Sequence, residues 1–347
     1  MTNTPVSPRV SIVLPTFNRS RFLGDAFRAI RAQSASSWEL IVVDDGSTDD
    51  TREVVAALAA SIPQPVRYLY QDNQGAYGAR NTGIDHASAD YIAFYDSDDL
   101  WLPHHLSDCM SALDQHADVD WVYGASKVVD LESRRTIAEN AFYERGQPRP
   151  FMRLAHDERG RLSVITDGDA VRCQILHGLY CGLQNSVLRR RVFDKLRFKT
   201  AFRNEAEDQL FAIRAVAAGF RLAYIDDVHV QYHVHAENSS GAATGGSLEK
   251  TRRVFEPLIR GYEEVAADVP LTAAERRALQ QRLGRELFWH LGYAGYWKAG
   301  QQREALDVFA RALRVWPWDL RRWKTYGVAL VRDFTSRSVA SGAHRER

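Results

Sequence analysis

The sequence contains few cysteines and no long hydrophobic run. Its three cysteines, Cys109, Cys173 and Cys181, form no CxxC pair and cannot all be paired within one chain. This favours a reducing compartment and argues against a structural zinc site. No stretch approaches the roughly 20 apolar residues that span a bilayer, and the N-terminus lacks the basic and apolar regions of a signal peptide. We therefore expect a cytoplasmic protein.

The charges of the chain almost cancel. Its 45 Lys and Arg residues against 44 Asp and Glu residues give a formal net charge of +1. A chain of this kind has no global basic field to attract nucleic acid. With 45% hydrophobic and 26% charged residues, its composition is that of a globular protein, and 347 residues suit one large domain or two ordinary ones. We expect no nucleic-acid partner, and the oligomeric state stays open.

What the chain does contain is a cluster of carboxylates. In the segment YIAFYDSDDLWLP, an apolar run ends at Asp96, Asp98 and Asp99, and the segment has no Lys or Arg to neutralise them. Clustered carboxylates after a buried strand suit Mg²⁺ or Mn²⁺, and Mg²⁺ binds through one or two carboxylates plus substrate phosphates. Alternatively, Asp98 or Asp99 caps a helix that begins near Leu100, which would account for only part of the cluster.

Short apolar runs alternate with helical patterns through the first hundred residues. Runs typical of buried strands cover residues 10–14, 39–43, 66–70 and 91–95. Apolar residues at helical spacing predict intervening helices at about residues 21–33, 49–58 and 78–86. This alternation predicts an α/β fold with a mostly parallel sheet, whose ligands bind beyond the carboxyl ends of the strands. Three polar loops are expected there: residues 15–18, 44–47 and 96–99.

Taken together, four segments of the chain resemble glycosyltransferase family 2. They are SIVLPTFNR, IVVDDGSTDD, NQGAYGARNTGI and YIAFYDSDDLW, in family order and at compatible spacing. The resemblance is close over the first hundred residues and weaker to about residue 240. It implies a GT-A fold, a Rossmann-like, mostly parallel sheet flanked by helices. It also implies that Asp96-Ser97-Asp98 is the DxD motif, where Mn²⁺ or Mg²⁺ bridges a carboxylate and the diphosphate of a nucleotide sugar.

The resemblance also assigns donor-binding residues. It places Pro15, Thr16 and Asn18 beside the nucleotide, and Asp45 at the base of a uridine-type nucleotide. Asp45 could instead belong to an Asx-turn at its Asp-Gly step. The resemblance also brings Arg80 and Asn81 toward the nucleotide or diphosphate, although Arg80 could equally be a surface residue of a helix.

Metal ligands follow from the same comparison. Asp98 is the leading candidate, Asp96 would serve the ribose or the metal, and Asp99 is a third candidate. The segment DVHVQYHVHAENSS resembles a family element with an arginine, a spacer and a histidine. Here His233 replaces the arginine and His235 keeps the histidine. His235 is thus a candidate ligand of metal or phosphate, or of neither.

The segment NEAEDQLFAIRAVAAGF carries the expected catalytic base. Glu207 and Asp208 enter an amphipathic helix, and the resemblance makes Asp208 the general base, with Glu205 and Glu207 as the next candidates. The alternative is that acids at this position only stabilise a helix N-terminus. No QxxRW sequence, which family members that polymerise commonly carry, occurs in the chain. Addition of a single sugar is therefore expected.

The last hundred residues predict an all-helical extension after a Gly-rich linker at residues 236–247. Six of them fall at tetratricopeptide-like spacing: Trp289, Tyr296, Ala305, Phe309, Ala312 and Pro317. One repeat cannot bury its apolar face alone, so we expect this hairpin to pack on the catalytic domain. Alternatively, tryptophans interleaved with arginines around residues 314–324 lie on a membrane interface.

These observations divide the chain into four parts. We expect a nucleotide-sugar-binding half at 1–105, an acceptor-binding half with a mobile loop at 106–248, a helical region at 249–335 and a disordered tail at 336–347. The predicted function is metal-dependent, inverting transfer of one sugar from a nucleotide-diphosphate sugar, UDP-type favoured, to a saccharide or lipid-linked acceptor. Bacterial cell-envelope polysaccharide or glycolipid assembly, with peripheral contact at the inner face of the membrane, is the family-level expectation.

Two other functions remain open. A nucleotidyltransferase also combines an α/β fold with metal-binding aspartates, but would usually carry a Gly-rich phosphate loop after the first strand. PTFNRSRFL has no glycine before Gly24. The second is a non-catalytic scaffold that binds partners through the helical tail. Nucleotide-diphosphate binding with and without Mn²⁺ separates the scaffold from the enzyme.

Overall fold

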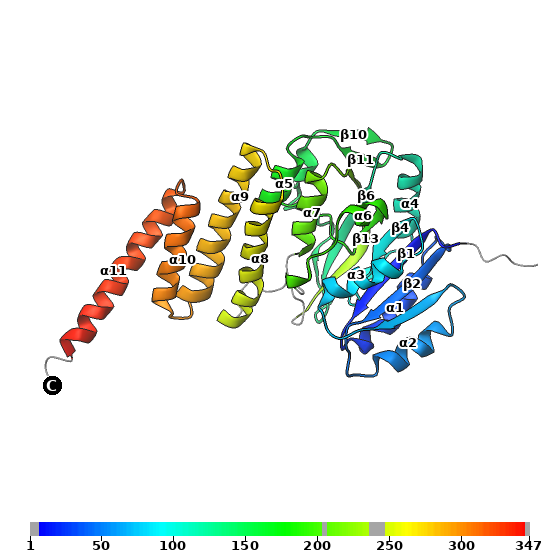
Figure 1. The fold of residues 1–347 in the computed structure, drawn as a ribbon, viewed down its shortest axis with the longest axis horizontal. Helices are drawn as coiled ribbons and strands as arrows, with labels where there is room; N and C mark the ends of the chain where they lie inside the picture. Colours follow the sequence, from blue (N-terminus) through cyan, green and yellow to red (C-terminus); the bar gives the residue numbers. More distant parts are fainter. Residues whose placement is uncertain (1–6, 203–206, 236–246, 344–347) are drawn as a thin grey trace, which may run out of the picture. The chain divides into compact units, whose positions relative to one another are not determined.

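The computed structural model describes residues 7–202, 207–235 and 247–343. The chain divides into two compact units, Met1–Ala236 and Glu237–Arg347. The first unit carries the sheet and its flanking helices, and the second is helical (Figure 1). The predicted α/β fold with a C-terminal helical extension is confirmed.

Strands and helices alternate through the first part of the sheet, as the hydrophobic pattern predicts. The elements are β1 (Val10–Thr16), α1 (Ser20–Arg31), β2 (Trp38–Asp44), α2 (Thr51–Ala59), β3 (Val66–Tyr70), α3 (Ala76–His86) and β4 (Tyr91–Phe94). Nearly every residue of β1, β2 and β4 is buried. These strands are continuously apolar because hydrophobic clusters cover both faces of the sheet.

The register of the central strands sets the position of the polar loops. β1 pairs in parallel with β2, with Thr16 opposite Asp44, and with β4, with Val13 opposite Phe94. The carboxyl ends of these strands therefore meet at one edge of the sheet. The loops at residues 15–18, 44–47 and 96–99 leave from this edge, as predicted.

The remaining strands extend the sheet into a mixed one. Its order is β10-β11-β13-β6-β12-β4-β1-β2-β3. The added strands are β6 (Trp121–Asp130), β10 (His156–Arg159), β11 (Leu162–Ile165), β12 (Ser186–Arg189) and β13 (Leu222–Val234). β12 runs antiparallel to β4 and β6, whereas β13 runs parallel to β6.

Shorter elements complete the first unit. The small strands are β5 (Leu100–Trp101), β7 (Thr136–Ala138), β8 (Tyr143–Glu144) and β9 (Gln147–Pro148). The helices are α4 (His105–Gln115), α5 (Ala170–Leu176), α6 (Arg191–Lys195) and α7 (Glu207–Ala217), with 3₁₀ turns at Pro150–Arg153 and Thr200–Phe202. A helix beginning near Leu100 was the alternative explanation of the aspartates, and it is wrong. Leu100 and Trp101 pair with β13 instead.

The second unit is a series of packed helices. They are α8 (Leu248–Asp268), α9 (Ala273–Arg285), a π-helical segment (Glu286–Trp297), α10 (Gln302–Val315) and α11 (Leu320–Ala343). The Gly292 backbone lies against Phe309, since a Cβ there would be 2.8 Å from the ring. The π-helical segment therefore packs closely on α10 at this point, and the tetratricopeptide-like hairpin stays a prediction. None of the described helices has the length and apolar character needed to cross a membrane.

Helix α11 continues through residues 336–343, where the sequence predicted a disordered tail. Residues 320–343 contain no proline, the residue that most strongly breaks a helix, and their two glycines are Gly327 and Gly342. The linker expected at 236–247 lies, except for Ser247, outside the described residues. Ser247 caps α8 by accepting a hydrogen bond from the Lys250 N–H.

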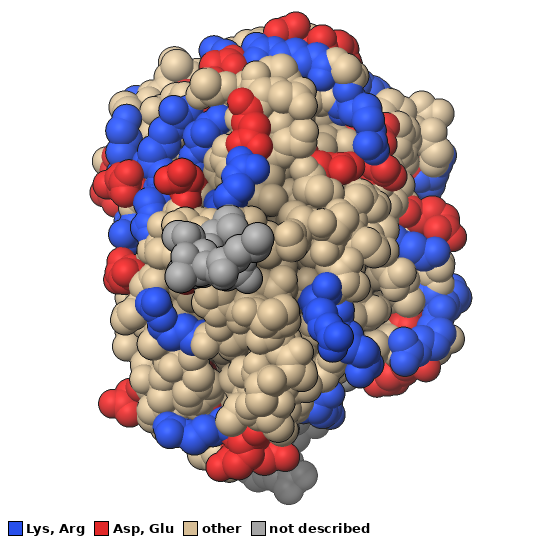
Figure 2. Space-filling view, turned by 90° about the vertical axis from the view of Figure 1, so that its right-hand side faces the viewer, with Lys and Arg blue, Asp and Glu red and all other residues tan. Residues whose placement is uncertain are grey.

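Acidic and basic side chains are interspersed on the face of the molecule shown in Figure 2. This mixture agrees with the formal net charge of +1.

Candidate active site

The three aspartates follow β4 in a tight turn. The Asp99 N–H donates to the Asp96 carbonyl at 3.0 Å. Asp99 is buried, with an exposed fraction of 2%, whereas Asp96 and Asp98 are only partly buried. The turn therefore leaves two carboxylates accessible at the edge of the sheet and buries the third.

Side chains from three separate segments reach the turn. Arg80 of α3 donates to Asp96 Oδ1 at 2.6 Å. Arg19, in the loop after β1, donates to Asp98 Oδ2 at 2.6 Å, and His235 Nε2 lies 2.9 Å from the same oxygen. The positive charge that the segment itself lacks is thus supplied by residues distant in sequence.

Asp99 is held by β13. Its Oδ1 accepts a hydrogen bond from the His233 N–H at 3.0 Å, while its Oδ2 is buried with no partner among the described residues. Burial first, and then the charges of Asp98 and Asp96, raise the pKa of Asp99 well above its usual range. The His233 ring, with Nδ1 at 2.7 Å from the Asp98 carbonyl, also binds the backbone of the turn.

The loops after β1 and β2 are joined by Asn18. This residue has a φ of 51°, in the left-handed region, and its Oδ1 accepts from the Thr48 N–H at 2.8 Å. Its own N–H donates to Ser47 Oγ at 2.9 Å. Nearby on β1, next to Pro15, the Thr16 hydroxyl is buried and finds no hydrogen-bond partner in the described part of the chain. A buried hydroxyl without a partner at a strand end is available to a ligand.

Asp45 organises the segment after β3. Its Oδ1 accepts from Gln71 Nε2 at 2.7 Å and from the Gln74 N–H at 2.9 Å, and its Oδ2 accepts from the Gly75 N–H at 2.7 Å. A carboxylate can accept about four hydrogen bonds, so these three leave capacity for one more. Asp45 therefore shapes the loop at residues 71–75.

The turn at residues 44–47, for which an Asx-turn at Asp45 was considered, is held by its neighbour Asp44. Asp44 Oδ1 accepts from the Ser47 N–H at 2.8 Å, and its Oδ2 accepts from the Tyr68 hydroxyl at 2.5 Å. Burial and this hydrogen bond raise the pKa of Tyr68 to about 12, so the hydroxyl remains a donor at neutral pH. Asp44 is thus occupied in fixing the turn itself.

Arg80 and Asn81 are adjacent on α3 but face different partners. The Arg80 side chain is buried, so the interpretation of Arg80 as a surface residue is wrong; its guanidinium lies 5.2 Å from the Tyr77 ring centroid. The Asn81 amide pairs with the backbone of Phe198, donating at 2.9 Å and accepting at 3.2 Å. The recorded contacts therefore connect Arg80, and not Asn81, to the carboxylates.

Asp208 lies in the first turn of α7, where its N–H contacts the Tyr77 hydroxyl at 3.3 Å. Burial is the largest cause that raises the pKa of Asp208, and the charge of Asp96 adds to it while Arg80 opposes it. These influences bring Asp208 into the same electrostatic neighbourhood as the pair of Arg80 and Asp96.

Of the two other acids considered, Glu207 is fully buried and Glu205 lies outside the described residues. Glu207 Oε1 accepts from the Lys199 N–H at 2.8 Å and from the Arg214 guanidinium. Glu207 is therefore engaged in holding α7 in place.

Sequence reasoning assigned no role to Arg19 or Tyr77. Arg19 directly follows the PTFN segment, and the missing counter-charge near the aspartates was the signal that could have identified it. Tyr77 carried no comparable signal, because its contact with Asp208 joins residues 131 positions apart.

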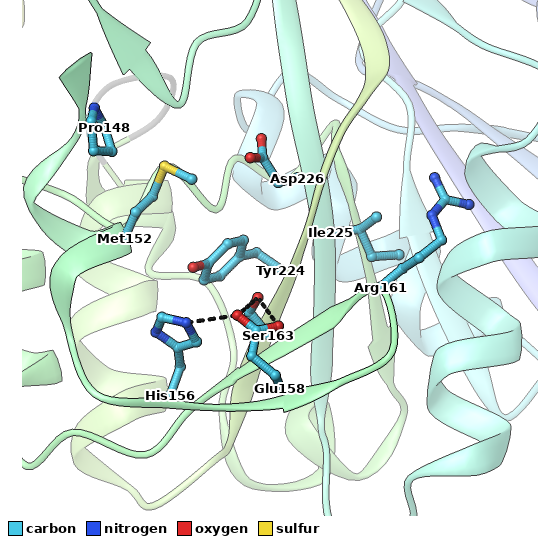
Figure 3. Close-up of a pocket in the computed structure, with 9 residues that line it drawn as sticks. All are labelled: Pro148, Met152, His156, Glu158, Arg161, Ser163, Tyr224, Ile225 and Asp226. Atoms are coloured by element: carbon cyan, nitrogen blue, oxygen red, sulfur yellow. Dashed lines mark hydrogen bonds and ion pairs between the residues drawn. The ribbon is translucent and has the colours of Figure 1, made fainter. Parts of the chain in front are cut away.

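An open hollow of about 440 Å³ lies elsewhere in the first unit (Figure 3). His156 and Glu158 approach to 2.8 Å within it, and Ser163 donates to Glu158. Its lining residues are Pro148, Met152, His156, Glu158, Arg161, Ser163, Tyr224, Ile225 and Asp226. This set includes none of the predicted site residues, so the hollow is separate from the carboxylate site.

Comparison with known proteins agrees with this geometry. The model of the family described as glycosyl transferase family 2 matches residues 11–197. The chain belongs to this family.

One relative is UDP-Glc:alpha-D-GlcNAc-diphosphoundecaprenol beta-1,3-glucosyltransferase WfgD of Escherichia coli, 33% identical over 124 residues that cover 36% of this chain and 48% of the relative. The chain spans less than two thirds of the length of this and the other first curated relatives.

Solved structures share the fold. S. aureus TarS 1-349 in complex with UDP-GlcNAc has a TM-score of 0.61 and 20% identity, covering 88% of this chain and 81% of that chain. Mannosyltransferase PcManGT from Pyrobaculum calidifontis, in complex with GDP-Man and Mn2+, has a TM-score of 0.56 and 20% identity over 94% of this chain and 85% of that one.

Proposed function

We propose that this protein is a metal-dependent, inverting glycosyltransferase that moves one sugar from a nucleotide-diphosphate sugar to an acceptor hydroxyl. The observation that carries the proposal is the grouping of Asp96, Asp98, Arg80 and Asp208 beyond the carboxyl ends of parallel strands. Ligands of open α/β sheets bind at this edge. Membership of glycosyl transferase family 2 supports the type of reaction.

The donor nucleotide binds between the loops after β1, β2 and β3. The unpartnered Thr16 hydroxyl and the Asn18 bridge support a nucleotide site there. Asp45 has one acceptor position left, which suits the imide N–H of a uracil, while Asn81 stabilises α3 rather than touching the nucleotide. A UDP-type donor is favoured, in line with the UDP-GlcNAc named for TarS.

Asp96 and Asp98 would hold Mn²⁺ or Mg²⁺, with Asp99 and His235 beside them. The donor set fits such an ion because hard divalent cations prefer carboxylate oxygens, and the buried Asp99 Oδ2 lacks a partner in the described structure. The ion supplies positive charge that stabilises the departing diphosphate. Arg19 and Arg80 add positive charge at the same place. PcManGT is named with Mn2+, which agrees with this proposal.

Asp208 acts as the general base. It takes the proton of the acceptor hydroxyl while the acceptor oxygen bonds to the anomeric carbon, and the bond from that carbon to the diphosphate oxygen breaks with its electron pair. One displacement of this kind inverts the configuration. Burial raises the pKa of Asp208, which moves it closer to neutral pH and makes the carboxylate a better proton acceptor.

The acceptor is a saccharide or a lipid-linked saccharide of the bacterial cell envelope. The relative WfgD is named for a diphosphoundecaprenol-linked acceptor, which supports this class. Peripheral membrane contact would involve α11, where Trp323 and Leu320 are exposed, and the preceding Trp318, which is 72% exposed. The protein would then work at the inner face of the membrane.

A donor screen tests the proposal. The intact protein is incubated with UDP-, GDP- and dTDP-sugars in Mn²⁺ or in EDTA, and the release of nucleoside diphosphate is measured. We expect Mn²⁺-dependent release from a UDP-sugar. Release of pyrophosphate from a nucleoside triphosphate would indicate a nucleotidyltransferase instead, and absence of Mn²⁺-dependent UDP binding by calorimetry would leave only a scaffold.

A further inference from the structure

A second group of potential metal ligands lies in the first unit, between α4 and β13. His105 and Cys109 are one helical turn apart on α4, and His229 comes from β13. All three side chains are fully buried. The residues proposed above to bind donor, catalytic metal or acceptor include none of them.

The distances within this group match those around a tetrahedral ion. The two Nδ1 atoms of His105 and His229 are 3.3 Å apart, and Cys109 Sγ lies 3.9 Å and 3.7 Å from them. With Zn–N of about 2.0–2.1 Å and Zn–S of about 2.3 Å, tetrahedral geometry places two nitrogens about 3.3 Å apart and a nitrogen and a sulfur about 3.6 Å apart. The three ligand atoms therefore stand close to the corners that one ion would require.

Hydrogen bonding among these side chains does not account for all their polar atoms. One Nδ1–H···Nδ1 hydrogen bond can join the two rings, but the Nε2 atoms of His105 and His229 are buried with no partner among the residues described. Zinc bound to both Nδ1 atoms would replace the Nδ1–H···Nδ1 hydrogen bond and fix each ring proton on Nε2.

A carboxylate and a glycine lie beside His229. Asp108 Oδ2 lies 4.0 Å from His229 Nε2, and metal-ligating histidines commonly donate their second N–H to a carboxylate. Gly124 leaves room for the His229 ring, since a Cβ there would be 2.2 Å from its Cγ.

We propose that His105 Nδ1, His229 Nδ1 and Cys109 Sγ form a zinc site that holds α4 against β13. When zinc binds, the Sγ–H bond breaks, its proton goes to solvent, and the sulfur electron pair bonds the ion. The soft thiolate distinguishes this site from the all-carboxylate turn, which suits harder cations. Four residues after His229, the same strand carries His233, whose N–H donates to Asp99. Zinc here would stabilise the strand that supports the carboxylate turn.

The sequence, with three cysteines and no CxxC pair, argued against a structural zinc site. It did not indicate the proposed site because the three ligands are far apart in the chain. His105 and Cys109 form a local pair, but His229 lies 124 positions after His105. Short ligand motifs cannot reveal a site whose third member comes from a distant strand. The pairing of β5 with β13, together with the hydrogen bond from the Leu102 N–H to the His229 carbonyl, brings the three together.

Cobalt substitution of the intact protein tests this proposal. The chelator-stripped protein is titrated with Co²⁺ and its absorption spectrum recorded. We expect a near-ultraviolet thiolate-to-cobalt charge-transfer band and visible bands of tetrahedral cobalt, both displaced by Zn²⁺. Cys109→Ser should lose the charge-transfer band, whereas the matched control Cys173→Ser, a buried cysteine outside the group, should keep it. A wild-type spectrum without this band, or one retained in Cys109→Ser, would overturn the proposal.

X-ray absorption of the wild-type protein provides a measurement that does not depend on a folded variant. Protein loaded with Zn²⁺, and dialysed against excess Mg²⁺ to clear the carboxylate turn, should show one sulfur and at least two nitrogen neighbours. A zinc shell of oxygen and nitrogen alone, or loss of all zinc on dialysis, would overturn the site. None of these readouts uses glycosyl transfer, so the zinc site and the proposed enzymatic function can fail separately.

Discussion

Arg80 and Asp96 form an ion pair of 2.6 Å in which the arginine side chain is 9% exposed and the aspartate side chain 29% exposed. The pair joins α3 to the turn after β4. Because a buried guanidinium is costly without a partner, each residue stabilises the position of the other. Asp208 lies close enough for Arg80 to lower its pKa.

Replacing Arg80 should destabilise the protein. Breaking a buried pair costs about 3–5 kcal/mol, and the partial exposure of Asp96 reduces the expected loss for Arg80→Met to about 1–3 kcal/mol. Urea unfolding measures this loss. The control is Arg197→Met, whose exposed pair with Asp85 should contribute only about 0–1 kcal/mol. Equal losses in the two variants would contradict a structural role for the Arg80 pair.

Asp98→Asn should abolish the Mn²⁺-dependent part of UDP binding while leaving the fold intact. Asparagine keeps the size and can still contact Arg19, but it lacks the negative charge that a hard cation needs. Calorimetry of UDP with and without Mn²⁺ measures the effect. Asp85→Asn, at an exposed position of α3, should bind like the wild type. Unchanged metal-dependent affinity in Asp98→Asn would remove this residue from the metal site.

Asp208→Asn should separate binding from transfer. Asparagine can hydrogen-bond the acceptor hydroxyl but cannot accept its proton, so transfer should fall by about 10²–10⁴-fold while donor affinity changes little. Single-turnover transfer and UDP binding are the two measurements. Glu207→Gln should chiefly lower stability, because Glu207 is bound to Arg214 and the backbone of Lys199. Wild-type transfer rates in Asp208→Asn would place the base elsewhere.

The rate of transfer should depend on pH through Asp208. Burial raises the pKa of this carboxyl above that of an ordinary aspartate, and only its deprotonated form can accept the proton. Activity should therefore fall with decreasing pH at a higher pH than an exposed aspartate would allow. Arg80→Met removes a charge that lowers the pKa, so it should move this acidic limb to still higher pH. If activity fell at the same pH in Arg80→Met and in the wild type, the link between Arg80 and Asp208 would be contradicted.

Two glycine substitutions should change stability in opposite directions. A Cβ at Gly83 of α3 would lie 2.2 Å from Val13 Cγ1, so Gly83→Ala should push α3 away from β1 and cost about 1–3 kcal/mol. A Cβ at Gly24 of α1 meets only the Arg28 guanidinium at 3.9 Å, so Gly24→Ala should stabilise the helix by up to about 1 kcal/mol. Thermal and urea unfolding check both signs, and destabilisation by both would refute the packing argument.

The sequence predicted the parallel part of the sheet well because β1, β2 and β4 are buried on both faces. Each of the four predicted strand segments between residues 10 and 95 became a strand, and each amphipathic segment between them became a helix. Local patterns also located Asp96, Asp98 and Asp99, since their lack of nearby positive charge is visible in the sequence itself. These features depend on neighbours along the chain.

Features that depend on long-range pairing could not be predicted in the same way. The donors to Asp98 come from Arg19 and His235, which only the assembled sheet brings together. Asn81 has the same residue type and spacing as a ligand-binding residue, yet its amide pairs with Phe198, 117 positions away. Leu100 is in a strand because it pairs with β13, and the sequence around Leu100 does not indicate this pairing.

The way Asp45 holds the loop at residues 71–75 has a consequence for how such a scaffold can evolve. Two of its three hydrogen bonds come from main-chain N–H groups, which are present whatever side chains residues 74 and 75 carry. Gly75 is restricted by its φ of 84°, but the side chains at positions 72 and 74 are exposed and free to vary. Substitutions there would alter the chemistry beside the proposed nucleotide site while the loop keeps its shape. If the donor binds as proposed, single mutations on this loop would change donor preference with no repacking of the core.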